Sequence, residues 1–543
     1  MLIRIPRWLI LSICAFFLSQ GSRMSETLFE YAKNLEIFSA LYKELGTNYV
    51  DEIEPGKLMK TGIDAMLKSL DPYTVYFSEY QAEEALMDRQ GQYGGVGCRT
   101  IIRNNYPVVV EIMEGYAFSK AGIQMGDIIT HYNGNDLKGK SSDELMVLMR
   151  GAPNSSFTVT IQRQGKTLNK TVTRMVIKTS SVSFNKLLAN DIAYVKLEEF
   201  DQSAAAEIEK SLKDMMSKTT LKGVILDLRD NGGGLLDQAV KIVGLFVGEN
   251  QLVVNLKGQN PQGPKSWITP NKALGSIGPA ILSNTPLVVL INERSASASE
   301  VVSGSLQDLD RAVIMGQTSF GKGLVQNYIS LPYRTQMKIT TAKYYTPSGR
   351  CIQRLNYDQK DEQGNATTKS ANQKLQFKTK NGRVVFDGGG IDPDIQTDAF
   401  QGSEILKWLN QQYILFDWCN QWALTKTDTT NFSVNNTEWQ QFTAYAAKQS
   451  TLILAENWKK GLGKSEIYPS QLKPFESIEI KNNILKDLEA NKSSIQYKLI
   501  SEIMQRKLSR TSYLQQYLNL DSELKQAQDL LLNLDKYNKI LKP

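Results

Sequence analysis

Histidine is almost absent from this sequence, since the 543 residues include a single one, His131. A hydrolase built on a Ser-His-Asp triad needs an imidazole beside its serine. His131 lies at the end of a short apolar run that leads into Asn133-Gly134, a pattern typical of a strand entering a turn. That is an unfavourable place for a catalytic base. A serine nucleophile in this chain would need another base, and a desolvated lysine is the main alternative.

Cysteine is also scarce, with four residues in the whole chain: Cys14, Cys98, Cys351 and Cys419. Their wide spacing predicts neither a disulfide framework nor a metal site. With only one histidine available as well, a zinc enzyme is not expected. No metal and no other cofactor is indicated by the sequence.

Dense clusters of basic residues are missing too. The formal net charge of +7 is small for this length, so nucleic acid is not an expected partner. An apolar content of 41% and a charged content of 22% are ordinary for a soluble globular protein. The length allows three or four domains, each large enough for its own core.

The sequence also lacks a long hydrophobic run. The apolar stretch from Trp8 to Leu18 covers about 11 residues, against the roughly 20 needed to span a bilayer. Arg4 precedes it and small residues follow it, which predicts a secretory signal over residues 1–21 with cleavage after Gly21. Cys14 lies too deep in the run for a lipid-attachment site. We expect export to the periplasm of a Gram-negative bacterium, with inner-membrane tethering only if the signal stays uncleaved.

The remaining chain divides by its patterning into four regions. Residues 22–90 look helical, and residues 91–180 show short β-type runs around a helix that a serine caps at 142–149. Residues 181–400 alternate strands and helices, which predicts a layered α/β core, and residues 401–543 look helical again. The fold class expected is therefore α/β, with a small β-rich domain before the core and a helical extension after it.

Two junctions between a strand and a helix could carry chemistry. The first runs from Asp227 to Gly234 and ends in three glycines, which allow a tight turn with exposed N–H groups at a helix start. It lacks the spacing of a Walker or dinucleotide loop. The second junction holds Ser295, Ser297 and Ser299 at the start of a helix. Either a nucleophile or plain helix capping would explain these serines, and the spacing does not choose among them.

A lysine downstream is the candidate base. Lys322 is flanked by Gly321, Gly323 and apolar residues, not by other charges. It could face solvent, as most lysines do, or be drawn inward and lose its proton. Lowering its pKa by three units would cost about 4 kcal/mol, which requires burial. Gln326 could orient such a lysine.

Taken together, these segments resemble the C-terminal processing (tail-specific) proteases, the S41 serine peptidases that carry a PDZ domain. The matching stretches appear in the family's order and cover about residues 30 to 400. They are Ser69–Tyr73, Tyr93–Gly97, Ala121–Ile129, Ile225–Leu236, Ser295–Glu300, Thr318–Gln326, Tyr344–Arg350 and Gly388–Asp394. An ordered set of this kind is far more specific than any single motif. The resemblance implies a crotonase-like protease core at 181–400 with a PDZ domain inserted at 91–180.

The resemblance also implies roles for individual residues. The family's nucleophile corresponds to Ser297, its general base to Lys322, and the glutamine that supports the lysine to Gln326. The oxyanion donors would be the backbone N–H groups of Ala298 and Gly233. This implies a serine endopeptidase that works by a Ser-Lys dyad through an acyl-enzyme, with protein or peptide C-termini as substrates.

In the PDZ domain the resemblance implies a peptide-binding groove. The carboxylate-binding loop would be Gly95-Val96-Gly97-Cys98, which would hold a free C-terminus by its backbone N–H groups. The helix side of the groove would be lined by Leu145, Leu148 and Met149. For Leu145 a place in the domain core is an equal alternative, and His131 would be an incidental strand residue.

Three departures from the family pattern are visible. Gly232 stands where many members have proline, Glu293-Arg294 bring charge next to the serine cluster, and residues 401–543 exceed what a minimal member needs. The extension could pack on the core, mediate self-association or hold an adaptor. Two alternative functions stay open. One is a catalytically silent or adaptor-dependent PDZ scaffold, and the other is a different serine-lysine hydrolase.

Overall fold

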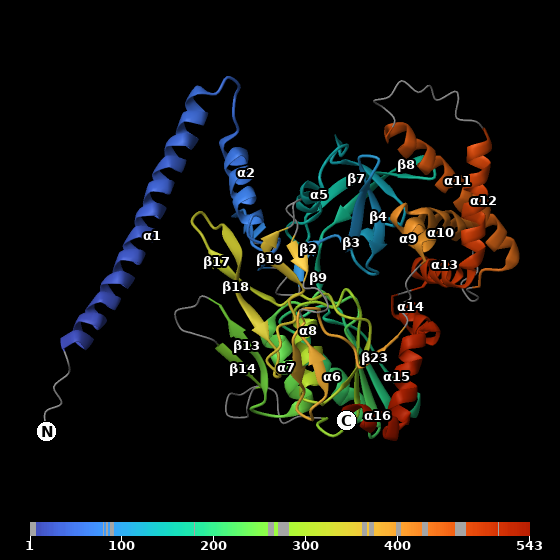
Figure 1. Ribbon diagram of the computed structural model, residues 1–543. Coiled ribbons are helices and arrows are strands. Elements are labelled where there is room, and N and C mark those ends of the chain that lie inside the picture. Colours follow the sequence, from blue (N-terminus) through green and yellow to red (C-terminus); the bar gives the residue numbers. More distant parts are fainter. Residues whose placement is uncertain are drawn as a thin grey trace.

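The fold is described here from a computed structural model. It describes residues 7–79, 81–82, 85–86, 92–178, 180–258, 265–269, 282–360, 366–368, 374–397, 403–425, 433–461, 474–508 and 510–542. The first helix, α1 (Arg7–Asn48), projects away from the body and includes most of the segment predicted as a signal (Figure 1). A shorter helix, α2 (Pro55–Lys68), leads back to the body. Among the described helices, none is long and apolar enough to cross a membrane.

A six-stranded sheet forms the centre of the core. Its first pair is antiparallel and all later pairs are parallel. In order across the sheet the strands are β10 (Val182–Leu188), β11 (Ile192–Leu197), β12 (Gly223–Asp227), β15 (Leu287–Ile291), β16 (Val313–Gly316) and β23 (Ile395–Gln396). The short 3-10 turn η1 (Ala189–Asp191) joins the first two. Every residue of β12, β15 and β16 is buried, as expected for parallel strands covered on both faces.

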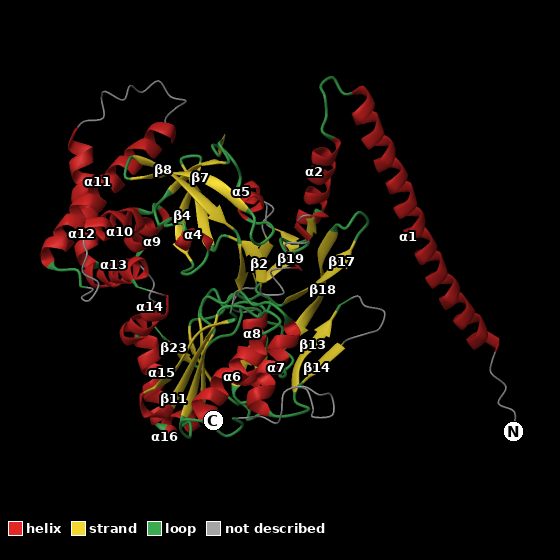
Figure 2. Cartoon of the chain, turned by 180° about the vertical axis from the view of Figure 1, so that it is seen from behind, coloured by secondary structure: helices red, strands yellow, loops and turns green. Residues whose placement is uncertain are grey.

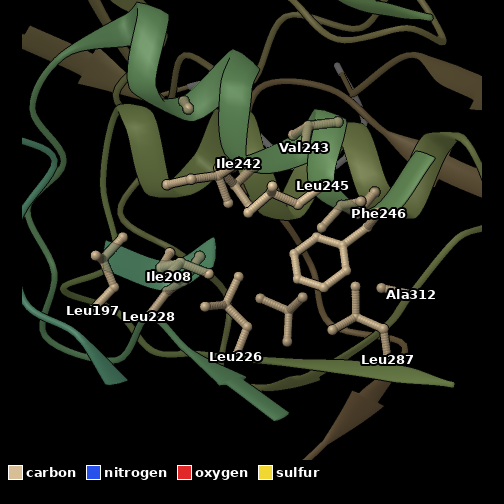
Figure 3. Packing of buried hydrophobic residues seen from close by; sticks show 14 of the residues in the cluster. Leu197, Ile208, Leu226, Leu228, Ile242, Val243, Leu245, Phe246, Leu287 and Ala312 are labelled. Carbon is tan, nitrogen blue, oxygen red and sulfur yellow. The ribbon is translucent and has the colours of Figure 1, made fainter. Parts of the chain in front are cut away.

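Helices cover both faces of this sheet. One face packs on α6 (Ala204–Met216), α7 (Leu236–Val247) and α8 (Ala298–Asp308), as shown for the α7 contacts in Figure 3. The opposite face packs on α15 (Ser522–Leu532) and α16 (Leu534–Leu541), which come from the end of the chain (Figure 2). Side chains alternate between the faces, so that Leu226 joins the first cluster and Ile225 the second. The expected α/β core is confirmed, with its third layer supplied by the C-terminal extension.

A second sheet stands beside the core as an arm. It consists of β1 (Val75–Phe77), β18 (Gln336–Tyr345), β13 (Leu252–Lys257) and β14 (Lys265–Ile268), with β17 (Leu324–Ser330) also paired to β18. The strand β1 lies in the region expected to be helical throughout. It pairs with β18 from Val75 to Phe77, so residues 22–90 also contribute to the sheet. The helical expectation for that region was incomplete, because the pairing joins segments more than 250 residues apart.

The inserted domain has the PDZ pattern of a small curved sheet with two helices. Its strands are β3 (Cys98–Arg103), β4 (Tyr106–Ile112), β5 (Ile128–Tyr132), β6 (Asn135–Asp136), β7 (Ser156–Arg163) and β8 (Lys166–Thr173). Its helices are α4 (Ala117–Lys120) and α5 (Ser142–Met149). The domain is joined to the rest through an antiparallel pair, β2 (Gln92–Gly95) with β9 (Met175–Lys178).

The C-terminal extension forms a helical bundle before it returns to the core. The bundle comprises α9 (Glu404–Gln411), α10 (Ile414–Thr425), α11 (Asn436–Gly461), α12 (Pro474–Ala490) and α13 (Lys492–Lys507). It continues through α14 (Arg510–Tyr517) and η5 (Leu518–Leu520) to α15. Two small hairpins complete the described elements: β19 (Leu355–Lys360) with β20 (Ala366–Thr368), and β21 (Gln376–Lys378) with β22 (Val384–Phe386).

The helical bundle contacts the PDZ domain directly. Phe416 of α10 packs with Val108 and Val110 of β4. Arg103 of β3 forms a bidentate ion pair with Asp417, at 2.6 and 2.8 Å. The extension therefore contacts both the PDZ domain and the core.

Candidate active site

Ser297 occupies a strained position at the start of α8. The turn before it is fixed by Ser295, whose hydroxyl donates to the Leu228 carbonyl at 2.8 Å and accepts from the Asn292 N–H at 2.9 Å. Ser297 itself is the residue preceding the helix and has φ 54° and ψ −114°. Non-glycine residues avoid such angles at a cost of about 1–3 kcal/mol, and they persist where the surroundings impose them. The geometry selects Ser297 among the three serines, because Ser295 and Ser299 are fully buried and bonded to backbone carbonyls.

Glu300 connects Ser297 to the lysine loop. Its buried carboxylate accepts from the backbone N–H of Ser297 at 2.8 Å and of Lys322 at 2.8 Å. It also accepts from the Gly321 N–H at 2.7 Å and the Ser319 hydroxyl at 2.5 Å. Burial raises the pKa of Glu300, while these donors act in the opposite direction.

Glu300 was not among the residues proposed from the sequence. Its signal was present as Ser-x-x-Glu across residues 297–300, the pattern of a helix capping box. The contacts with the loop at 319–322 could not be seen in that pattern, because they depend on the tertiary fold.

Lys322 is half-buried and held against an aromatic ring. Its Nζ lies 4.3 Å from the ring centroid of Tyr73, a residue of the N-terminal segment. Burial lowers the pKa of Lys322 to about 8, and the positive charge of Lys338 acts in the same direction. The carboxylates of Glu300 and Asp71 oppose the shift. A lysine with a pKa near 8 is neutral in a substantial fraction at mildly alkaline pH, as a general base requires.

Tyr344 holds the backbones of the two candidate catalytic residues together. Its buried phenol lies 3.1 Å from the carbonyl oxygen of Ser297 and within hydrogen-bond distance of the carbonyl of Lys322. Burial raises the pKa of Tyr344 well above its ordinary value, so the hydroxyl stays protonated as a donor. Tyr344 and Glu300 thus both form hydrogen bonds with the same two segments.

The glycine turn after β12 lies against the serine. A Cβ added to Gly233 would come within 2.8 Å of Ser297 Cβ and 2.9 Å of the Ala298 nitrogen. Gly233 also has φ +101°, so this position needs glycine for both reasons. The Gly233 N–H donates to Asn231 Oδ1 at 2.8 Å. The structure therefore brings Gly233 and Ala298 to Ser297, with the Gly233 amide bonded within its own turn.

Gly232 shows why one departure from the family pattern is accommodated. It is exposed, and a Cβ added there would meet no atom within 4 Å. A side chain at this position is not in contact with the serine. The residue at 232 therefore affects the turn through its backbone alone.

Gln326 lies on β17 in the same region, but its contact differs from the expected one. Its side-chain nitrogen donates to Thr340 Oγ1 at 3.2 Å. Among the described residues the structure gives no hydrogen bond between Gln326 and Lys322. The supporting role proposed for Gln326 stays a prediction.

A cleft of about 1490 Å³ connects these groups. It is bounded by the arm sheet and the core, and Ser297, Ala298, Lys322 and Gln326 all line it. Pockets for small ligands measure roughly 300–1,000 Å³, so this volume suits a longer chain such as an extended peptide.

The residues proposed for peptide binding lie apart from this cleft, in the PDZ domain. Val96, Leu145 and Met149 are buried in the core of that domain, and Leu148 is half-buried beside it. Leu145 is therefore placed in the domain core, the alternative weighed for it. Gly97 has φ +71°, and a Cβ there would lie 2.5 Å from Tyr116 Cβ. Burial raises the pKa of Cys98 to about 12, which keeps its thiol protonated.

His131 stays outside the active site. It lies on β5 of the PDZ domain, where its Nδ1 is 3.1 Å from the hydroxyl of Thr130. Over the described part of the chain, no group of histidine, cysteine and acidic residues has the arrangement of a metal site. Among the described residues, Cys98, Cys351 and Cys419 form no disulfide.

Comparisons with known proteins agree with this geometry. Residues 191–360 match the model of peptidase family S41, residues 108–163 match a PDZ domain, and residues 405–531 match the C-terminal helical domain of probable PDZ-proteases. The last match covers the extension, to which the sequence patterns alone assigned no family.

Two relatives found by sequence support the family match. A carboxy-terminal-processing protease of Bartonella bacilliformis is 36% identical over 326 residues, which cover 59% of this chain and 73% of that protein. A probable CtpA-like serine protease of Staphylococcus aureus is 34% identical over 59% of this chain and 62% of its own length, less than two thirds of the relative. A solved photosystem II D1 C-terminal processing protease is 26% identical, with 66% of this chain and 92% of that one covered and a TM-score of 0.36.

The family match and the relative from Bartonella bacilliformis identify a hydrolytic enzyme of the protease class. More specifically, the chain belongs to peptidase family S41 and carries a PDZ domain. The resemblance seen in the sequence is thereby confirmed, and so is the enzyme class.

Proposed function

We propose that this protein is an exported endopeptidase that binds apolar protein C-termini through its PDZ domain and cleaves them with a Ser297–Lys322 dyad. One observation carries the proposal. Ser297, in a strained helix-start conformation, and Lys322, with its pKa lowered to about 8, share the hydrogen-bond partners Glu300 and Tyr344 and line one cleft.

The reaction follows from these positions. Neutral Lys322 accepts the proton of the Ser297 hydroxyl as the oxygen attacks the scissile carbonyl, forming a C–O bond and a tetrahedral oxyanion. The Ala298 N–H at the start of α8 and the Gly233 N–H are the donors for that oxyanion. The C–N bond then breaks and the leaving amine takes the proton from Lys322. Water hydrolyses the resulting ester with Lys322 again acting as the base.

For the Gly233 N–H to donate to the oxyanion, its hydrogen bond to Asn231 must be shared or released. The Gly233 N–H points to Asn231 Oδ1 at 2.8 Å in the structure without substrate. A developing oxyanion is a stronger acceptor than a neutral amide oxygen, so its arrival favours the exchange.

Recognition of the substrate C-terminus belongs to the PDZ domain in this proposal. The strand β3 is at the edge of its sheet and follows directly on the loop at Gly95–Cys98. An edge strand can pair with an extended peptide, while backbone N–H groups of the loop hold the terminal carboxylate. Leu148 of α5, half-buried against the domain core, supplies apolar surface for the peptide in this proposal.

Export is the remaining part of the proposal, and the N-terminal sequence supports it. The basic start, the short apolar run and the small residues at its end are those of a secretory signal. Sequencing the N-terminus of protein recovered from the periplasm is expected to show residue 22 first. Retention of the full N-terminus in the membrane fraction would contradict cleavage and favour tethering.

The activity is tested with one peptide that ends in a free apolar carboxylate and an amidated copy. Wild type is expected to cleave the free acid and to cleave the amide more slowly, while Ser297→Ala and Lys322→Ala variants cleave neither. Binding without cleavage by wild type would support the silent scaffold instead. Full activity of Ser297→Ala would contradict the proposed site.

A further inference from the structure

Arg229 joins the oxyanion turn to the last part of the chain. It lies just after β12, four residues before Gly233, and its side chain is only 13% exposed. On its own side it binds Asp227, with Nη2 at 2.6 Å from one carboxylate oxygen and Nε at 3.0 Å from the other. Its remaining hydrogen bonds reach a segment nearly 300 residues away.

Two carboxylates of the C-terminal segment complete the set. Arg229 Nη2 donates to Asp521 at 2.7 Å, and Nη1 donates to Glu523 at 2.7 Å. Asp521 also begins helix α15 by accepting from the Leu524 N–H at 3.0 Å. The guanidinium therefore has acidic partners on both sides, and its position depends on both.

Glu523 extends the contact to two further strands of the core. Its second oxygen accepts from Gln317 Nε2 at 2.6 Å and from the hydroxyl of Thr397. Gln317 follows β16 directly and Thr397 follows β23. Since β12, β15, β16 and β23 are parallel, their carboxyl ends meet at one edge of the sheet, where Ser297 also lies.

Removing both acids would leave Asp227 as the one acid of this group that still pairs with Arg229. Asp227 is fully buried and receives the Tyr194 hydroxyl at 2.7 Å, with Lys196 Nζ at 3.9 Å. Arg229 thus faces one acid at the end of β12 and two at the start of α15. A buried arginine that loses its partners shifts its side chain or recruits water, because an unpaired buried charge is costly.

We infer that Asp521 and Glu523 are positioning residues of the peptidase, which hold Arg229 and through it the turn that carries Gly233. The inference rests on the proposed Ser297–Lys322 mechanism. Neither acid lines the cleft, so neither touches the substrate. Their effect reaches the reaction through the turn, because Gly233 packs so closely on Ser297 that an added Cβ would lie 2.8 Å from the serine Cβ.

Isosteric variants isolate this role from folding. Asp521→Asn keeps a good helix-capping side chain while it removes the charge, and Glu523→Gln keeps the shape. The apolar contacts of α15, through Leu524, Leu530 and Leu531, are unchanged in both. The matched control is Asp529→Asn, on the exposed face of the same helix.

The experiment measures kcat and KM on a cleavable peptide, inhibition by a peptide aldehyde, binding of an uncleavable C-terminal peptide and thermal unfolding. The aldehyde forms a tetrahedral adduct with the serine and reports on the oxyanion donors. In the double variant, kcat is expected to fall by about 10- to 100-fold, and inhibition by the peptide aldehyde is expected to weaken in parallel. KM and C-terminal peptide binding change little, the double variant stays folded at the assay temperature, and Asp529→Asn behaves as wild type.

A second measurement tests whether the acids act through the arginine. In an Arg229→Lys background, where the bidentate contacts are already lost, adding Asp521→Asn and Glu523→Gln is expected to cause little further loss. An unchanged kcat in the double variant, a loss explained entirely by unfolded protein, or an equal loss in both backgrounds would overturn the inference. Activity of Ser297→Ala would instead overturn the proposed function itself, so the two failures are distinct.

Discussion

At the scale of single residues, strain and burial are concentrated where the chemistry is proposed. Ser297 has a positive φ that a serine avoids, and Lys322 sits half-buried against Tyr73. Both states are unfavourable by themselves and are imposed by the hydrogen bonds of Glu300 and Tyr344. Strain and burial of this kind lower the stability of the folded protein, and variants that relieve them make the loss measurable.

Replacing Ser297 by glycine should separate stability from activity. Glycine adopts φ 54° without steric cost, so we expect Ser297→Gly to be about 1 kcal/mol more stable than Ser297→Ala, while both are inactive. Unfolding in urea, followed by circular dichroism, gives the comparison. Equal stability of the two variants would contradict backbone strain at this position.

The pH dependence of cleavage should follow Lys322. Because burial lowers its pKa to about 8, the neutral base is the minor form at pH 7, and kcat/KM is expected to rise through about pH 8 and then level. The positive charge of Lys338 helps to lower that pKa, so Lys338→Met should move the midpoint to higher pH. Lys343→Met, at an exposed position of the same strand, is the control and should leave the midpoint in place.

The same lysine has a consequence for stability. Its pKa is about 8 when folded and 10.5 as its ordinary value, so between these pH values the unfolded chain binds more protons. The contribution of Lys322 to stability therefore increases as the pH rises from 8 to 10.5. Below pH 8 the full cost of burying its charge is present.

At the scale of elements, the site is assembled where strands end and helices begin. The turn after β12 and the start of α8 meet so closely that only glycine fits at 233. The adjacent Gly232 faces open space. Of these two neighbouring glycines, Gly232 has room for a side chain and Gly233 does not.

Alanine at these two positions provides a matched comparison. Gly233→Ala would bring a methyl group within 2.8 Å of Ser297 Cβ at φ +101°, and we expect activity to fall at least 100-fold. Gly232→Ala should lose far less, because nothing lies within 4 Å of the new methyl group. Cleavage of one peptide under identical conditions compares the two variants, and similar losses of activity in both would contradict the packing described.

Local patterns predicted several elements well. The helix expected at 142–149 is α5, because its cap involves Ser141 and Glu144, which are close in sequence. The helix after Ser297 was expected for the same kind of reason. The strand β1 was missed, since its partner β18 is far along the chain and three residues carry little pattern of their own.

At the scale of the whole molecule, the C-terminal extension is part of the enzyme core. Its bundle contacts the PDZ domain through Phe416 and the Arg103–Asp417 pair. Its last helices cover one face of the central sheet (Figure 2). Of the roles considered for the extension, packing on the core is the one visible in the structure.

Truncating a contact of α15 should therefore destabilise the peptidase core. Leu530 is 4% exposed against the sheet, so Leu530→Ala is expected to cost about 2–4 kcal/mol in the free energy of unfolding. Leu532 of the same helix is 50% exposed, and Leu532→Ala should cost less than about 0.5 kcal/mol. Denaturant unfolding measures both, and equal costs would show that α15 is not docked as described.

By itself the sequence determined the enzyme class, because its ordered motifs resemble those of the S41 peptidases, and through that resemblance it proposed Ser297 and Lys322 as the catalytic pair. Its single histidine lies where a catalytic base is not expected. It also determined the local caps and turns, whose partners are neighbours in the chain. Only the tertiary structure decided the lowered pKa of Lys322, the position of Glu300 between two loops, and the contact of Arg229 with Asp521 and Glu523. Burial and charge pairing depend on segments that are distant in sequence, and a local pattern contains no information about which of them meet.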